Sequence, residues 1–389
     1  MVTVVNTAGI GLWMALNVIY AITVIGLTPG ELGIGLGVAS GLRLVLSAPT
    51  GHLADRCGPR VVQVWSFAAL VPLTLLLTVV HGFAQYVVVV SAHAIAYGTN
   101  RAAQMAMVAG VVPADDRVRI RGYLRAATNV SISVGAGLAG LLLVIGTPAA
   151  FRWAIVGNAV TYALAGLLTA RLPTVAPQPA RRGPRLVALR DRPFLVFVLL
   201  DGLLSMHYLL LDVVLPLWIV RHTEAPKWMV AALLLANTVL VVLLQVRATR
   251  GTDDLRGAAR AARWGGVCVA IACVVFSMTG KVSALAACAL LGLGALVHVL
   301  GEVRQAAGSW GISFGLAPDH AQGQYQGAYS MGIDLGRMLA PVVLVWLALE
   351  HGVAGWLVMA GVFGAVGLAM PPVVAWARTR RPETAPVLV

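Results

Sequence analysis

The chain has 389 residues, of which 59% are hydrophobic and only 11% are charged, and its mean hydropathy is +0.87. Soluble domains carry roughly 25% charged residues, so this composition excludes a soluble fold and indicates a membrane protein. The net charge of +13 could also suggest a nucleic-acid partner. We expect none, because no basic face with interleaved aromatic residues is free to bind it.

Apolar stretches long enough to cross a bilayer account for most of the chain. A hydrocarbon core about 30 Å thick needs about 20 apolar residues per helix, and twelve stretches meet this requirement. The predicted fold class is therefore an all-α membrane protein with twelve transmembrane helices. The predicted spans are 5–27, 32–50, 61–80, 84–112, 122–146, 152–170, 194–220, 228–247, 263–280, 283–314, 323–348 and 353–377.

A proline-rich hydrophilic segment, 171–193, divides the spans into two halves. The spacing from Pro113 to Gly122, which leads into the next predicted span, recurs from Pro318 to Gly327, and this indicates parallel repeats. In this register Asn129 of the first half corresponds to Asp334 of the second. The predicted parts are an N-terminal six-helix bundle at 1–170, a cytoplasmic linker at 171–193, a C-terminal six-helix bundle at 194–377 and a cytoplasmic tail at 378–389.

Twenty of the 28 Lys and Arg residues lie in or beside alternate loops and the C-terminal tail, whereas the opposite loops and their edges hold only Arg152, Arg221, Lys227 and Lys281. By the positive-inside rule, this bias places both termini in the cytoplasm. Arg outnumbers Lys 26 to 2, which is typical of a GC-rich genome. We therefore expect a multi-pass protein of the cytoplasmic (inner) membrane of a bacterium.

A short polar motif lies between the second and third predicted spans. Its glycines let two helices meet closely, and its neighbouring acid and base supply opposite charges at the membrane surface, where we expect them to stay hydrated. The motif residues are Gly51, Asp55, Arg56, Gly58 and Arg60.

This motif resembles the loop that joins the second and third spans in the major facilitator superfamily of secondary transporters, although Pro59 replaces the usual basic residue. The resemblance implies the major facilitator fold, in which two six-helix bundles rock around a substrate site near the bilayer midplane. It also implies a monomer. No metal-ligand cluster, phosphate-binding glycine loop or nucleophile–base arrangement is evident, so we expect no cofactor, no metal and no enzyme activity.

Two further segments are similar to motifs of the drug/proton antiporters in that family. Arg101 and Gln104 match an Arg-x-x-Gln motif in which Met105 replaces a glycine, and 135–140 is rich in glycine and alanine but lacks the exporters' proline. The resemblance implies that Arg101 switches partner when a nearby carboxylate takes a proton. The alternatives are a static pair for Arg101 and simple close packing for 135–140.

Ionisable side chains inside a membrane are costly unless they are paired or hydrated. No Asp or Glu lies in the predicted spans of the first half, so we expect the proton-carrying carboxylate in the second half. Asp334 is the favoured candidate, and permanent pairing with Arg337, three residues later, is the alternative. For Arg43 we expect a structural ion pair.

Asp212 and Glu302 are further candidates for the coupling proton. Asp212 shares a face of the predicted helix 194–220 with Asp201, which lies nearer the cytoplasmic end and is expected to be solvated. His298 precedes Glu302 by one turn in a polar stripe and could relay protons to it. A hydrogen-bonded pair without a transport role is the alternative.

Several polar and aromatic side chains of the spans are candidates for lining the substrate cavity. For the aromatic ones, anchoring at the membrane interface is the alternative. The candidates are Trp13, Asn17, Tyr20, Arg43, Tyr208, Asn237 and Trp310.

The sequence thus favours proton-coupled efflux of small amphipathic compounds by alternating access. Uptake of a nutrient by a symporter or facilitator of the same fold is the first alternative. A non-transporting membrane receptor is the second, and the costly buried charges count against it. The expected partners are a small-molecule substrate, protons and the lipid bilayer.

Overall fold

The computed structural model describes residues 1–145, 147–177 and 186–380, and these ranges contain helices and no β-strand. The prediction of an all-α protein is confirmed. Parts of the predicted linker (178–185) and tail (381–389) lie outside the described residues. The chain divides into two compact units, which are described separately below.

The first unit comprises Met1–Val187 together with Asp319–Asp334. Its break with the second unit at Val187 falls inside the predicted linker 171–193. The inclusion of Asp319–Asp334 was not expected from the sequence. The second unit comprises Ala188–Pro318 and Leu335–Val389. The division into two six-helix bundles stays a prediction.

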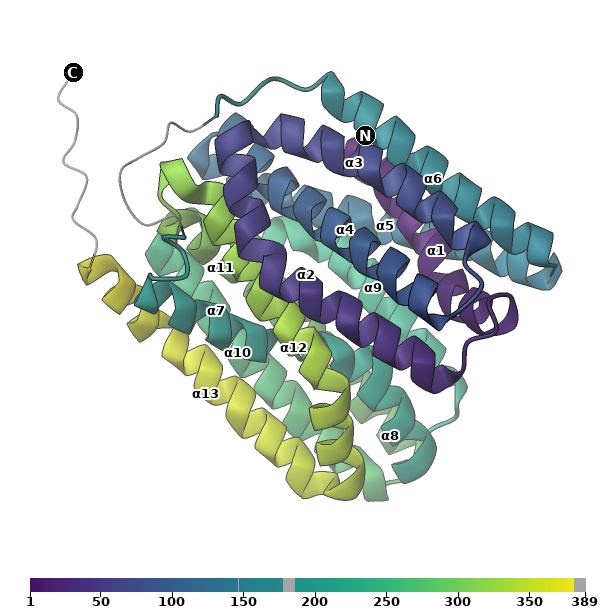
Figure 1. The fold of residues 1–389 in the computed structure, drawn as a ribbon. Helices are drawn as coiled ribbons and strands as arrows, with labels where there is room; N and C mark the ends of the chain where they lie inside the picture. The colour runs from purple at the N-terminus through teal and green to yellow at the C-terminus, as the bar shows by residue number, and fades with distance from the viewer. Residues whose placement is uncertain (146, 178–185, 381–389) are drawn as a thin grey trace. The chain divides into compact units, whose positions relative to one another are not determined.

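Six long helices and the beginning of a seventh build the first unit (Figure 1). Within it α1 lies beside α5 and α6, α3 lies beside α4 and α6, and α2 lies beside α4. The helices are α1 (Val2–Thr23), α2 (Pro29–Cys57), α3 (Pro59–Leu76), α4 (Phe83–Val111), α5 (Arg117–Ile145), α6 (Pro148–Ala170) and the first turns of α12 (Gln322–Glu350), with short 3-10 turns at Leu77–Val79, Ala114–Asp116 and Asp319–Ala321.

Local sequence explains where α2 begins and ends. At its start, Thr28 Oγ1 accepts a hydrogen bond from the Glu31 backbone N–H, while the Glu31 carboxylate accepts one from the Thr28 backbone N–H, which is a capping box. At its end, Gly58 has φ +89°, a conformation that favours glycine, and Pro59 starts α3. The stretch 51–57, which we expected to belong to the loop between the second and third spans, is therefore the last part of a helix.

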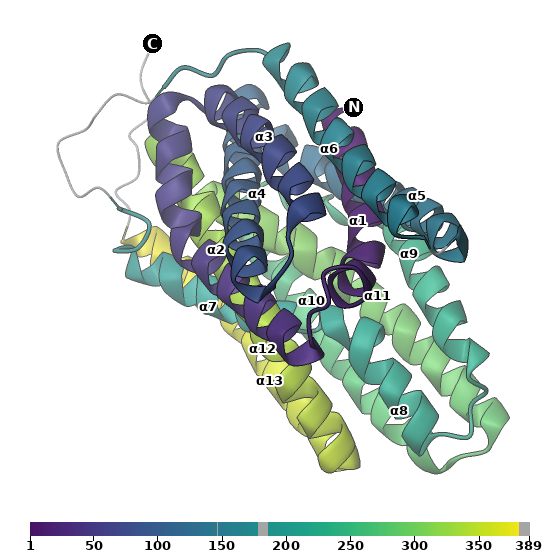
Figure 2. The same cartoon turned by 45° about the vertical axis from the view of Figure 1, so that its right-hand side comes forward.

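Eight helical segments, one of them a π-helical turn, build the second unit. Here α10 lies beside both α11 and α13 (Figures 1 and 2). A Cβ atom added to Gly266 would lie 2.7 Å from the Cα of Gly367, so α10 and α13 meet through glycine. The segments are α7 (Arg192–Ser205), a π-helical turn (Leu210–Val214), α8 (Leu215–His222), α9 (Trp228–Ala248), α10 (Leu255–Ser277), α11 (Ala284–Leu316), the rest of α12, and α13 (Gly352–Thr379), with a 3-10 turn at Met278–Lys281.

The predicted span 194–220 is not one regular helix, because a turn at 206–209 and the π-helical turn separate α7 from α8. Pro216 gives the reason: in a regular helix its ring would clash with the carbonyl four residues earlier, that of Asp212. The wider π turn relieves this clash. The expectation that Asp201 and Asp212 share one helical face is therefore wrong.

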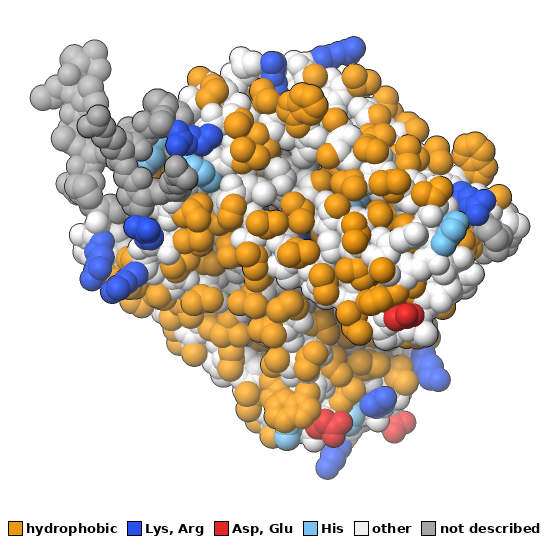
Figure 3. Space-filling view, viewed as in Figure 1, with side chains coloured by type: hydrophobic (Ala, Val, Ile, Leu, Met, Phe, Trp, Pro, Cys, Tyr) orange, Lys and Arg blue, Asp and Glu red, His pale blue; other side chains and the backbone are white. Residues whose placement is uncertain are grey.

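The helices are suited to a bilayer. Among the described residues, nine helices are long and apolar enough to cross a membrane, or ten if the two parts of α1, which is bent by 42°, form one span. Hydrophobic side chains predominate on the face drawn in Figure 3, whereas Lys and Arg side chains lie toward its margins. The count of twelve spans stays a prediction.

Candidate functional site

The first feature of the candidate site is a contact between α2 and the start of α12, both within the first unit. Asp55 Oδ1 accepts a hydrogen bond of 2.7 Å from the Gly323 backbone N–H, and Oδ2 accepts one of 3.0 Å from the Gln324 N–H. Asp55 is only 7% exposed. The carboxylate thus caps two free N–H groups of a helix N-terminus, where negative charge is favoured. The expectation that Asp55 stays hydrated is wrong, because backbone donors replace water.

Glycine makes this contact possible. A Cβ atom on Gly51 would lie 2.0 Å from the carbonyl oxygen of Gly323, and one on Gly323 would lie 2.4 Å from the carbonyl oxygen of Gly51. One turn earlier on α2, Ser47 donates a 2.8 Å hydrogen bond to the carbonyl of Gly327, which also lacks room for a side chain. The two backbones therefore approach as closely as helices can.

The other motif residues lie at the turn between α2 and α3. Arg56 is exposed in the last turn of α2, and Gly58 supplies the bend into α3. Arg60 Nη1 donates a 2.8 Å hydrogen bond to the carbonyl of Leu172, just after α6. A cavity of about 340 Å³ lies nearby, and its lining includes Asp55, Arg117 and Asp319.

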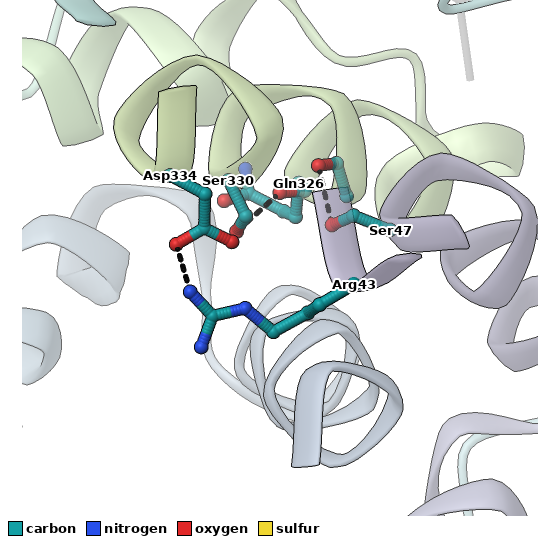
Figure 4. Close-up of polar contacts among 6 residues, drawn as sticks. Arg43, Ser47, Gln326, Ser330 and Asp334 are labelled. Carbon is teal, nitrogen blue, oxygen red and sulfur yellow. Dashed lines mark hydrogen bonds and ion pairs between the residues drawn. The ribbon is translucent and has the colours of Figure 1, made fainter. Parts of the chain in front are cut away.

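The second feature is an ion pair between α2 and α12 (Figure 4). Arg43 Nη2 lies 2.8 Å from Asp334 Oδ1, and the side chains are 26% and 17% exposed, respectively. Arg43 lies at the midpoint of α2, and Asp334 lies close to the midpoint of α12. The structure therefore pairs Asp334 with Arg43. Permanent pairing of Asp334 with Arg337 stays an alternative.

Arg101 on α4 belongs to the same cluster. Its side chain is exposed, it interacts with Tyr97 one turn earlier, and its charge acts on Asp334. Gly98, also on α4, faces Arg43: a Cβ atom there would lie 2.8 Å from the Arg43 side chain. We call Arg43, Arg101 and Asp334 the ion-pair cluster.

The third feature is a buried polar network between α7 and α11 in the second unit. Gln305 Nε2 donates to Asp201 Oδ1 at 2.8 Å, Ser309 also donates to Asp201 Oδ1, and the Tyr208 hydroxyl donates to Gln305 Oε1 at 2.9 Å. Asp201, Gln305 and Ser309 are each at most 1% exposed. The expectation that Asp201 is solvated is wrong, since side chains of α11 supply its hydrogen bonds. We call these four residues the buried network.

His298 and Glu302 lie on the same helix as Gln305. His298 Nε2 lies 3.2 Å from Nδ1 of His207, and its Nδ1 lies 3.9 Å from Glu302 Oε2. Both histidines are fully buried and Glu302 is 5% exposed. The predicted polar stripe therefore faces the interior of the second unit, where His207 contacts it.

Asp212 and Arg337, both in the second unit, are exposed and interact electrostatically. They form a balanced pair of charges. Among the described residues no three His, Cys, Asp or Glu side chains gather in a way that could hold a metal ion.

The cavity candidates fall into two groups. Tyr20 and Trp310 are buried in helix packing, at 1% and 6% exposure, and the Tyr20 hydroxyl donates to the Leu77 carbonyl. Trp13 and Asn17, like Tyr208 and Asn237, are partly exposed. Their roles stay predictions.

The sequence did not reveal three of the contacts above: Arg43 with Asp334, Asp55 with the start of α12, and Asp201 with α11. Each joins residues more than 100 positions apart. The sequence offered one usable signal: the predicted spans of the first half contain no acid, so the ion pair expected for Arg43 needed a carboxylate from elsewhere in the chain.

Comparisons with known proteins agree with this fold. The family model described as Major Facilitator Superfamily matches residues 1–341. No curated protein matches the chain.

Two solved proteins illustrate the structural likeness. The human organic anion transporter MFSD10 (TETRAN) aligns with a TM-score of 0.71 and 16% identity, over 95% of this chain and 97% of that one. A bacterial homologue of the iron transporter ferroportin, in an outward-facing state, aligns with a TM-score of 0.76 and 13% identity, over 97% of this chain and 98% of that one. Its iron-soaked form gives 0.75. At these identities the likeness shows the fold alone. With the family match, it follows that this chain belongs to the Major Facilitator Superfamily and is a multi-pass membrane transporter rather than an enzyme.

Proposed function

We propose that this transporter is proton-coupled and moves small amphipathic compounds by alternating access, with efflux as its working direction. The observation that carries the proposal is the ion pair of Arg43 with Asp334, which is partly exposed and lies near the middle of two membrane-spanning helices. A charged pair costs free energy in this position. It is best explained by a carboxylate that must gain and lose a proton.

Protonation of Asp334 would remove its charge and break the ion pair with Arg43. Because the pair joins α2 to α12, its loss would weaken one of the contacts that hold these helices together. A proton shifts the balance between two states only by its differential affinity for them. Coupling thus follows if the state that keeps the α2–α12 contact binds the proton less tightly than the state that lacks it.

Asp55 would hold α2 and α12 together at their ends on the predicted cytoplasmic side. Its two hydrogen bonds to the α12 N-terminus exist only while α2 and α12 stay together. Such a cap contributes about 0.5–2 kcal/mol, which is enough to bias a two-state equilibrium several-fold without locking it.

Glu302, with His298, and Asp212, with Arg337, remain the other candidates for proton binding. The exposed Asp212 can exchange protons with water, whereas Glu302 is buried and would need the His298 relay. We rank both below Asp334, because neither connects α2 with α12.

Efflux is proposed from the resemblance of 98–105 and 135–140 to exporter motifs, and uptake by proton symport is the second candidate. The observation that favours symport is the surplus of arginine over acid in the ion-pair cluster. A monomer in a bacterial inner membrane, with both termini in the cytoplasm, completes the proposal.

The experiment uses everted vesicles that contain this protein and a luminal pH dye. Lipophilic cations, neutral antibiotics, organic acids, sugars and amino acids are added in turn. Proton movement that one compound triggers, and that Asp334→Asn abolishes, would support the proposal. If Asp334→Asn, Glu302→Gln and Asp212→Asn each left such movement intact, the assignment of the coupling site would fail.

A further inference from the structure

The ion-pair cluster carries more positive than negative charge. The guanidinium group of Arg43 pairs with the carboxylate of Asp334, and the charge of Arg101, which interacts first with Tyr97, also acts on this carboxylate. The predicted spans of the first half contain no acid of their own. With Asp334 ionised, the cluster therefore has a formal charge of one positive unit.

This surplus is accessible. Arg101 is exposed, and Arg43 and Asp334 are each partly exposed, although all three lie well inside long apolar helices. An exposed guanidinium at this depth would be very costly against lipid, so such residues face a water-filled passage or a polar ligand. The second unit differs, because its exposed pair, Asp212 and Arg337, is balanced.

Neighbouring charged and titratable groups do not cancel the surplus. On α5, Arg121 donates a 3.1 Å hydrogen bond to Gln326 and lies 5.6 Å from the ring centre of Tyr329, and Arg125 follows one turn later. On α4, Tyr97 interacts with Arg101, and the His93 ring packs against Tyr162 on α6. These groups add positive charge or none.

We infer that the substrate is a small amphipathic anion, held by the guanidinium groups of Arg43 and Arg101, and that it crosses the membrane together with the proton of Asp334. The inference rests on the proposed function, since it requires that Asp334 carries a proton. It goes further because it specifies the charge of the substrate and states that the proton and the substrate move in the same direction.

The step balances in atoms and charge. A proton from water binds the Asp334 carboxylate, and the hydrogen bond from Arg43 Nη2 to Asp334 Oδ1 breaks. The freed Arg43 N–H groups then donate to the substrate carboxylate, alongside those of Arg101. Because the proton releases a donor for the anion, each ligand raises the affinity for the other, and this coupling is reciprocal.

The charge balance favours cotransport, in which the proton and the anion move in the same direction, over exchange of one for the other. The empty cluster has a charge of plus one, and the cluster with both proton and anion has the same charge. The cluster with the anion alone would be neutral, and with the proton alone it would carry plus two. The proton-only form carries the largest charge, which is costly to bury in a membrane. In the anion-only form Arg43 stays bound to Asp334, so the anion lacks one of its two guanidinium partners and binds weakly. The empty and doubly loaded forms are therefore the main ones that reorient, and they carry the same charge.

Such a cycle is electroneutral and runs in either direction. It expels an anion whose concentration ratio across the membrane exceeds the opposing proton ratio, and otherwise takes it up. Efflux and uptake therefore become two directions of one mechanism.

The test uses purified full-length protein in proteoliposomes with three probes of similar shape: phenylacetate, phenethylamine and phenylacetamide, which are an anion, a cation and a neutral compound. Counterflow of each labelled probe is measured without a pH gradient, and luminal pH is recorded separately during net flux. Counterflow reports the charge of the substrate, and the pH signal reports proton coupling.

Counterflow of phenylacetate alone, with protons moving in the same direction, is the expected result. Counterflow of phenethylamine or phenylacetamide in preference, with proton movement, would overturn the inference and leave the proposed function standing. Phenylacetate counterflow with no proton movement would overturn the proposed coupling and therefore also the cotransport. Absence of counterflow for all three would count against the inference.

Variants separate charge from folding. Arg101→Gln is expected to lower phenylacetate counterflow at least about tenfold, and Arg101→Lys to restore part of it, because Lys keeps the charge but not the planar fork. Arg119→Gln is the matched control, since Arg119 is exposed and pairs with Asp116 in the turn before α5. Equal counterflow in Arg101→Gln and Arg119→Gln, with both proteins folded, would overturn the assignment of Arg101.

Discussion

Two aspartates of this transporter, Asp334 and Asp201, have opposite surroundings. Asp334 is partly exposed and paired with the charged side chain of Arg43 on another helix. Asp201 is 1% exposed and accepts hydrogen bonds from the neutral side chains of Gln305 and Ser309. A carboxylate must reach water to exchange a proton during each cycle, and of these two aspartates Asp334 is the one that is partly exposed.

The difference teaches that depth in the membrane does not by itself mark a coupling residue. A buried and satisfied polar network stabilises packing and specifies which helices meet. An exposed ion pair between helices can be broken by a single proton. Both patterns look the same in the sequence, as an acid inside an apolar stretch.

The largest effect is expected from Asp334→Asn, which removes the exposed carboxylate while keeping its shape. Proton-coupled flux should fall by about 100-fold, a typical size when a positioned proton-transfer group is lost. Thermal stability should change little, since Arg43 stays partly hydrated. Flux measured in vesicles with matched protein amounts checks this, and a variant that retains coupling would remove the distinction between the two aspartates.

Asp201→Ala should act on stability instead. Removing the acceptor leaves the donors of Gln305 and Ser309 without Asp201 in a dry interior, at a cost of about 1–3 kcal/mol. Asp201→Asn keeps one acceptor oxygen and should cost less. Thermal unfolding in detergent ranks the stability of the unmodified protein, Asp201→Asn and Asp201→Ala. Equal stability of all three would show that the buried network does not hold α7 to α11.

Asp55→Ala extends the comparison to a third carboxylate, that of Asp55, which is buried and accepts hydrogen bonds from a helix N-terminus. Its loss should favour separation of α2 from α12 by about 1 kcal/mol, as expected for an N-cap residue. Distances between spin labels on these two helices report the shift. An unchanged distance distribution would mean that the cap does not hold the helices together.

The smallest effect is expected from Gly98→Ala. The added methyl group would lie 2.8 Å from the flexible side chain of Arg43, which can move aside. We expect a change of about twofold in proton-coupled flux and no change in stability. Loss of flux comparable to that of Asp334→Asn would show that the position of Arg43 matters more than its charge.

The fold was largely predictable, because apolar stretches at the length of a bilayer and the motif at Gly51–Arg60 leave few alternatives. The family and the all-α class followed from them. The π-helical turn before α8 could have been anticipated from Pro216, whereas the burial of Asp201 could not, since it depends on which face of α11 meets α7. The partner of Asp334 was equally hidden, because local spacing pointed to Arg337, whereas packing brings Arg43 of another helix to within 2.8 Å.

The most direct test of proton binding at Asp334 needs no substrate. Infrared difference spectra of the protein in lipid, recorded between neutral and acidic buffer, report the carboxylic acid groups that form on protonation. We expect a carboxylic acid band that is lost in Asp334→Asn and kept in Asp201→Asn. A band that persists in Asp334→Asn and disappears in Asp201→Asn would contradict the central claim and place the exchanging proton in the buried network.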